Sequence, residues 1–489
     1  MNTIKRILIL EAWLLAWLIV EGCTNLDEEV FDQALQSEWG KTQEQRDALI
    51  GPLYASLSDY FAHFEALNCV TDEQLAPSRG GDWSEPEWRF LEEHTWPTDY
   101  WQFDGLWTWC YNSIAKINQQ MPISDDQTVA ELRALRAFYH YILLDNFGNV
   151  IIADKVESDG SSPEQSDKVE VYNFVESELL EVLPTLSTDV RANYGRMSKY
   201  VAHMILAKLY LNAGVFTGTP QWSKAIVQCD SIIDSNKFAI ADNFLSNFSI
   251  TNQNSTETIL ATPFDKSKKT GFYNSVIGLH YLNQLTYDLG YAPWNGYCTY
   301  AEFYDSFEDG DLRKNMWITG QQYDSKGEPL FDDGEPAVFT KDIPAFAMPA
   351  GTVARLAGYR NGKYEIQRGN SAPDQDNDFV IFRLADVFLM RGEAYFRLGD
   401  EAKALDDINF IRTKRIAPEF TSPLTADMIL AERGRELAFE FHRRQDLIRF
   451  DQFTKAWKFK PVSPKTRELY PIPFNQISLN PNLTQNPGY

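Results

Sequence analysis

The chain has 489 residues, of which 44% are apolar and 14% aromatic, so it is suited to a large, well-packed globule and is not a disordered protein. Its 45 Lys and Arg residues stand against 69 Asp and Glu residues, and the net charge of −24 argues against a nucleic-acid partner, because phosphate recognition needs clustered cations. Five cysteines without a CxxC pair argue against a disulfide framework or a zinc ribbon.

The N-terminus has the pattern of a secretory signal. Two basic residues precede an apolar run over 7–20, which is shorter than the ~20 residues that a membrane-spanning helix needs. The run ends in Val20-Glu21-Gly22-Cys23, which resembles the bacterial lipobox, in which the cysteine is acylated and becomes the new N-terminus. We therefore expect a lipoprotein signal peptide over residues 1–22 and a lipid anchor on Cys23. An ordinary signal peptide or an uncleaved anchor, with an incidental cysteine, is the alternative.

Helical periodicity marks two blocks of the remaining chain, about 49–238 and 379–450. The residues between them, about 241–378, are rich in Gly, Asn, Asp, Tyr and Pro, which predicts an irregular excursion with short strands. The six prolines of 461–489 predict an extended, turn-rich C-terminal segment. No low-complexity linker separates these parts, so we expect residues 23–489 to form a single, mainly α domain.

Within the helical blocks, small and aromatic residues recur at the spacings of tetratricopeptide helix pairs. Small residues let two antiparallel helices approach closely, and a Gly-Asp pair makes the turn between them. These residues are Phe388, Gly392, Ala394, Tyr395, Gly399-Asp400 and Ala404 in one copy, and Leu206, Ala207, Tyr210, Gly214, Trp222 and Ala225 in another. A helix over about 132–143 is the third candidate. The pattern predicts a tetratricopeptide-like helical-repeat scaffold, a class that usually binds rather than catalyses.

Tryptophans are dense between positions 83 and 109. Trp101, Trp107 and Trp109 lie beside apolar helix positions and are predicted to pack in the core. Trp83 and Trp88 stand among glycine, proline and charged residues instead, and a large ring on such a loop is expected to serve a ligand.

A sugar ring suits that loop, because its C–H face stacks on an aromatic plane while its hydroxyls need donors and acceptors. Asp72, Arg79 and Asp82 supply such groups nearby. In the excursion, Trp294, Asn295 and Tyr297 form a second aromatic and polar turn, and Arg368 stands in a polar loop before the second helical block. We take all these residues as candidates for ligand binding.

Catalytic and metal-binding motifs are absent from the sequence: it contains no HExxH, Walker A, GxGxxG or GxSxG pattern, and we expect no cofactor. His140 and His203 lie on apolar helix faces and are predicted to pack there. Asp374, Asp376 and Asp378 alternate as calcium ligands do, but an EF-hand would need glycine in place of Phe379. We expect no metal site, although a looser calcium site stays open.

Glu432, Glu436 and Glu440 form an i,i+4 stripe in the second helical block. Paired carboxylates occur in glycosidases, but Arg435, Arg443 and Arg444 lie one turn from a glutamate here, which would lower the carboxyl pKa values and spoil a general acid. The stripe therefore predicts an ion network within the scaffold, not a catalytic pair.

Several characteristic segments follow one another along nearly the whole chain: Leu135-Arg136-Ala137-Phe138-Tyr139 with Phe147-Gly148, Phe382-Arg383-Leu384-Ala385-Asp386-Val387 with Gly392-Glu393-Ala394, the stretch 431–449, and Leu469-Tyr470-Pro471-Ile472-Pro473 with Asn480-Pro481. Together they resemble the SusD/RagB family, the surface lipoproteins that capture nutrients for a TonB-dependent outer-membrane transporter. One departure is Asn149-Val150-Ile151, where many members have a proline.

The resemblance implies a non-catalytic, lipid-anchored protein on the surface of the outer membrane. It would bind an oligosaccharide and hand it to a SusC-like β-barrel transporter. It also implies that the loop around Trp83 faces the glycan and that the irregular excursion completes the site. A peptide- or protein-binding lipoprotein of the same fold is the alternative, and a surface glycosidase is a third option that the arginine-rich stripe disfavours.

Overall fold

The computed structural model describes residues 42–83, 86–156 and 162–489. The expected signal peptide over residues 1–22 and the lipid anchor on Cys23 lie outside these ranges. Within them, no helix combines the length and the apolar character needed to cross a bilayer.

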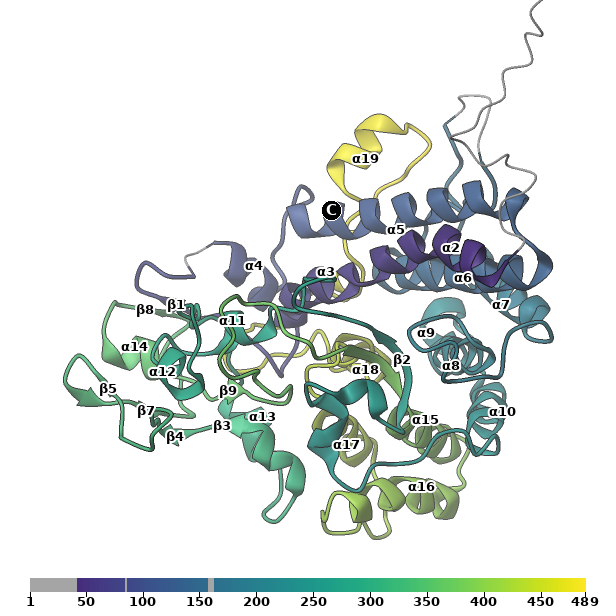
Figure 1. Ribbon diagram of the computed structural model, residues 1–489. Coiled ribbons are helices and arrows are strands. Elements are labelled where there is room, and N and C mark those ends of the chain that lie inside the picture. Colours follow the sequence, from purple (N-terminus) through teal and green to yellow (C-terminus); the bar gives the residue numbers. More distant parts are fainter. Residues whose placement is uncertain (1–41, 84–85, 157–161) are drawn as a thin grey trace, which may run out of the picture.

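The first helical block forms an array of antiparallel helices, seen at the top and right of Figure 1. Side-chain caps set their starts: Asp125 accepts a hydrogen bond from Thr128 N at 2.9 Å, and Asp167 forms a capping box with Glu170. The helices are α2 (Gln43–Leu57), α3 (Asp59–Leu67), α4 (Glu87–Glu93), α5 (Trp101–Gln120), α6 (Asp126–Phe147), α7 (Lys168–Val182), α8 (Lys199–Leu211), α9 (Ala213–Thr217) and α10 (Trp222–Ile233).

The second helical block begins with a strand, which corrects the prediction that it is helical from residue 379. Strand β10 (Phe379–Arg383) pairs antiparallel with β2 (Thr258–Thr262), and both are buried along their whole length. The run Phe-Val-Ile-Phe is typical of a fully buried strand. Helices α15 (Leu384–Arg397), α16 (Glu401–Lys414), α17 (Ala426–Leu437) and α18 (Arg443–Arg449) follow it.

The predicted tetratricopeptide-like pairing is confirmed: α8 packs on α10, α10 on α15, and α15 on α16. A Cβ on Gly392 would lie 3.1 Å from Ile408 Cγ1, so glycine lets α15 and α16 approach closely. Gly399 turns the chain with φ at +84°, and the Asp400 side chain accepts from Lys403 N to start α16. Arg391, on α15, joins three helices through Asp407 on α16 and Asp230 on α10.

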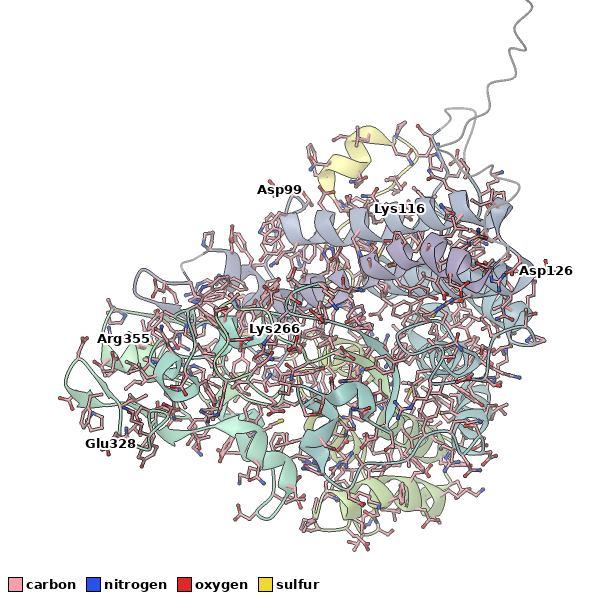
Figure 2. All side chains as sticks on the ribbon, in the orientation of Figure 1. Asp99, Lys116, Asp126, Lys266, Glu328 and Arg355 are labelled. Atoms are coloured by element: carbon pink, nitrogen blue, oxygen red, sulfur yellow. The ribbon has the colours of Figure 1, made fainter. Side chains whose placement is uncertain are left out.

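Strand β2 of the excursion lies beside α8. The rest of the excursion extends to the left and centre of Figure 1 and carries the short helices α11 (Asn274–Gly278), α12 (Asn283–Tyr287), α13 (Ala301–Asp305) and α14 (Thr352–Leu356). Two-residue strands pair around them, as predicted; β1 (Ser78–Arg79), from the first block, pairs in parallel with β8 (Ala347–Met348). Figure 2 labels Arg355 and Glu328 on this part of the molecule.

The C-terminal segment is mostly extended, but α19 (Phe474–Leu479) is a short helix that the proline-based prediction missed. It lies against α5 in Figure 1, where Gln476 Nε2 donates to Asp104 Oδ1 at 2.8 Å. The hydrophobic core includes residues from Ile50 to Leu483, so the C-terminal segment is part of the same packing.

Two of the three tryptophans on α5 are core residues, as predicted. Trp107 and Trp109 are 3% and 6% exposed, but Trp101 is 62% exposed, which corrects its assignment to the core. Trp101 shares the solvent stripe of α5 with Thr108 and Asn112, at i+7 and i+11.

Candidate functional site

The tryptophan loop and the 294–297 turn, 211 residues apart, meet in the structure. The rings of Trp83, Trp88 and Tyr297 pack together with centroids 4.9 to 5.7 Å apart. Trp83 Nε1 donates to Trp294 O at 2.8 Å, and a Cβ on Gly296 would fall 2.1 Å from Trp83 Cζ2. The indole of Trp83 thus lies directly on the backbone of the second turn.

Trp294 presents the accessible ring of this group. It is 52% exposed, whereas Trp83 and Trp88 are half-buried and Tyr297 is buried. Its backbone is fixed, because Trp294 N donates to Val276 O at 2.6 Å and Gly296 N donates to Ile277 O at 2.7 Å. We call this group the Trp294 surface: the exposed Trp294, whose backbone carbonyl accepts from Trp83, together with the packed rings of Trp83, Trp88 and Tyr297.

Asp82 and Tyr281 form a polar edge beside Trp83. The Tyr281 hydroxyl donates to the exposed carboxylate of Asp82. Burial and this hydrogen bond raise the pKa of Tyr281 to about 12, so the phenol stays protonated. Sequence reasoning missed Tyr281, because it stands 199 residues from Asp82 and belongs to no motif.

Asn295 and Arg79 have partners within the protein. Asn295 is buried with φ at +54°; its Oδ1 accepts from Arg360 Nη2 at 2.7 Å, and its Nδ2 donates to Arg355 O at 3.0 Å. Arg79 is 3% exposed, and its Nη1 donates to the carbonyls of Ala354 and Ala357. These bonds support the Trp294 surface from below, and a direct ligand contact by either residue stays a prediction.

Asp72 and Arg368 lie at other places. Asp72 pairs with Arg443 at the start of α18 and lines a separate hollow. Arg368 is exposed, stacks over the ring of Tyr287 with its Cζ 5.0 Å from the centroid, and donates to Thr286 O at 2.6 Å. Their roles in ligand binding also stay predictions.

The acidic stripe forms the predicted ion network, largely with partners from other elements. Burial alone would raise the pKa of Glu432, but Arg313, Arg435 and Arg412 together lower it to about 2. Glu436 accepts from Arg313 at 2.9 Å, and its pKa is also held well below the usual value.

Two details of that stripe differ from the prediction. Helix α17 ends at Leu437, so Glu440 lies beyond it, where it accepts from Lys363 Nζ at 2.6 Å and from Arg383 Nη2 at 2.7 Å. Arg443 and Arg444 contact Asp72 and Asp145 rather than the glutamates.

The alternating aspartates before β10 are occupied by hydrogen bonds within the protein. Asp374 and Asp376 accept from backbone N–H groups at 2.6 and 2.9 Å, and Asp378 accepts from Phe264 N and from the Tyr194 hydroxyl. In the part of the chain that the structure describes, no group of three or more His, Cys, Asp or Glu residues is placed to hold a metal ion.

The chain matches the model of the SusD family over residues 347–489. The starch-binding protein SusD of Bacteroides thetaiotaomicron is 28% identical over 422 residues, which cover 76% of this chain and 75% of that protein. Among solved structures, a laminarin-binding SusD-like protein has a TM-score of 0.74 at 22% identity, covering 92% of this chain and 100% of the other. The surface glycan-binding protein A of Bacteroides uniformis has a TM-score of 0.74 at 18% identity, covering 91% and 99%.

The structural similarities establish the fold, and the matches in sequence show a similarity to the SusD family. The SusD family model covers β8 and all of the second helical block, including Glu436 with its partners Arg383 and Arg415, and the starch-binding relative extends the match over most of the chain. This chain thus has the fold of SusD-like proteins, and over residues 347–489 its sequence is similar to the SusD family.

Proposed function

We propose that this chain is a lipid-anchored protein on the surface of the outer membrane, which binds oligosaccharides and delivers them to a SusC-like TonB-dependent β-barrel transporter. The names of its relatives support the ligand class, since they describe binding of starch, of laminarin and of glycans. Residues 23–489 act as one domain in this proposal, with the excursion facing the ligand.

The observation that carries the proposal is the half-exposed Trp294, whose backbone is hydrogen-bonded to the packed aromatic cluster through Trp83. An indole plane offers a sugar ring an apolar face, and the Asp82–Tyr281 pair beside Trp83 offers an acceptor and a hydroxyl. The site is a surface and not an enclosed cavity, so it suits a segment of a long chain better than a small isolated molecule.

Binding takes place without cleavage. A glycosidase needs one carboxyl group with a raised pKa to act as a general acid, opposite a second carboxylate. The glutamates of α17 have the opposite property, because the guanidinium groups around Glu432 and Glu436 hold their pKa values low. They stabilise the scaffold and do not react.

The experiment that tests the proposal is affinity electrophoresis of a soluble form lacking residues 1–23 through gels containing neutral polysaccharides. We expect retardation by at least one polysaccharide without release of reducing sugar. The exposed half of the Trp294 side chain is ~100 Å², and one face of it is ~50 Å². Covering that face at ~25 cal/mol/Å² gives ~1.3 kcal/mol, so Trp294→Ala should weaken binding about tenfold.

Trp101→Ala is the matched control, because Trp101 is similarly exposed but lies at the start of α5. This variant should bind as the wild type does. Equal losses in both variants, or no retardation by any polysaccharide, would refute the glycan site. Binding of peptides by a chain that ignores every glycan would favour the alternative, a peptide-binding lipoprotein of the same fold.

A further inference from the structure

A hollow of about 230 Å³ lies apart from the Trp294 surface. Aromatic side chains and an ion pair line it: Tyr300, Phe303, Trp457, Asp72, Arg443 and Glu302. We call it the Asp72 pocket. Its volume is below the roughly 300–1,000 Å³ of sites for drug-sized ligands, so it fits one small ring and not a chain.

Four distant segments build the Asp72 pocket. Asp72 follows the short helix η1 (Asn68–Val70), Arg443 begins α18, and Trp457 stands in the loop after α18. Tyr300 and Phe303 stand at the start of α13. The pocket is therefore formed only by the complete fold.

The ion pair gives the pocket its polarity. Arg443 donates from Nε and Nη2 to the two oxygens of Asp72 at 2.6 and 2.7 Å, and from Nη1 to Leu430 O at 2.8 Å. Each of its nitrogens thus has a partner, so Arg443 is not free to bind an anion. The Asp72 side chain stays 29% exposed, and its remaining lone pairs can accept hydrogen bonds from hydroxyl groups.

The mouth of the pocket adds one further acceptor and one donor, the exposed Glu302 and Lys458. The carboxylates of Asp72 and Glu302 disfavour an anionic ligand at this pocket. A cation is also disfavoured as the main ligand, because Arg443 already compensates the charge of Asp72. A neutral ligand with several hydroxyl groups satisfies both conditions.

The aromatic walls are fixed. The Tyr300 hydroxyl donates to the buried Glu92, and Lys460 Nζ lies 4.4 Å from the centroid of the Trp457 ring. Arg443 Cζ lies 5.8 Å from the ring centroid of Phe303. Such walls can pack against the C–H groups of a sugar ring without rearranging.

We propose that the Asp72 pocket is a second binding site, which takes a single neutral pyranose unit through Asp72, Glu302 and the aromatic walls. The ligand class rests on the proposed function, but the pocket shares no residue with the Trp294 surface. The second site would hold a chain end or a branch of the glycan whose main segment lies on Trp294.

The test uses the full chain in a zwitterionic detergent without a sugar headgroup, with saturation-transfer NMR of D-glucose, D-galactose and D-mannose. Ser306→Leu fills the pocket but keeps the ion pair, since the Ser306 hydroxyl only donates to Phe303 O at 2.6 Å. We expect a saturable signal from at least one sugar, at least tenfold weaker binding in Ser306→Leu, and binding within twofold of wild type in Trp294→Ala.

Lys458→Ala is the second variant, at the exposed mouth, and should weaken the same sugar about threefold even if Ser306→Leu does not fold. Loss of the signal in Trp294→Ala with no change in the two pocket variants would overturn the second site. So would the lack of any saturable signal up to about 50 mM sugar. If the wild-type chain gave neither of the expected results for the pocket but were retarded in gels that contain a polysaccharide, the proposed function would stand without the second site.

Discussion

Replacing Glu436 by glutamine removes the charge at the centre of the buried ion network. Glu436 accepts from Arg313 at 2.9 Å, from Arg383 at 2.6 Å and from Arg415 at 2.8 Å, and all four side chains are 0–1% exposed. Glutamine keeps the size of the side chain, but its amide NH₂ would point a donor at groups that are themselves donors. The variant thus measures the effect of the lost charge on stability without a change in side-chain volume.

The expected loss of stability is about 4 kcal/mol, because breaking a buried ion pair on one side costs roughly 3–5 kcal/mol. At ~2.1 cal/mol/K per residue, a chain of this length has an unfolding entropy near ~1 kcal/mol/K, so Tm should fall by about 4 °C. The surrounding arginines lower the pKa of Glu436 and keep it ionised. The difference in stability between the wild type and Glu436→Gln should therefore be constant above the ordinary pKa of a glutamate, and it should shrink only as the pH falls below that value.

The assay is thermal unfolding by circular dichroism, with urea titration as a second measure. Asp305→Asn is the matched control: Asp305 contacts Lys341 at 2.6 Å, but these side chains are 50% and 40% exposed. A surface pair contributes about 0–1 kcal/mol, so this Tm should move by no more than about 1 °C. Equal shifts of Tm in the two variants would refute the reasoning that an ion pair contributes strongly to stability only when it is buried.

Three further predictions follow from other parts of the structure. Trp83→Ala should weaken glycan binding as much as Trp294→Ala and lower Tm by a few degrees, because the indole of Trp83 packs on Gly296. Affinity gels and melting curves measure the two effects, and unchanged binding would contradict the prediction. Burial raises the pKa of Glu92 to about 8, so its ionisation should destabilise the wild type progressively from about pH 5 to 9, by up to ~5 kcal/mol. Glu92→Gln should therefore make Tm depend less on pH over this range, and parallel curves of Tm against pH for the two proteins would disprove this. Cys23→Ala should move the chain from the detergent phase to the aqueous phase on partitioning, and unchanged partitioning would overturn the lipid anchor.

Local patterns allowed much of the fold to be predicted. Gly392 and the Gly399-Asp400 turn identified the α15–α16 pair, because close approach and a left-handed turn each need a particular residue at one position. The exposure of Trp101 could also have been predicted, since it shares a helical stripe with Thr108 and Asn112.

The partners of charged groups could not be predicted in the same way. Arg313 stands 123 residues before Glu436, and Asp72 stands 371 residues before Arg443, so no periodicity connects them. Proximity in sequence suggested that Asp72 would join Trp83, but the chain between them carries Asp72 into a different pocket. Where side chains of similar chemistry are many, only the fold decides which of them meet.

In the proposed function, the ion network and the Trp294 surface act together. A shallow surface does not enclose its ligand, so its affinity depends on rings that are already fixed before binding. Arg313 lies in the excursion, whereas Arg383 lies on β10 and Arg415 directly follows α16, and Glu436 binds all three. The network thus fastens the excursion that carries Trp294 to the helical scaffold, and a loss of charge at Glu436 should reach the glycan surface through looser positioning rather than through any direct contact.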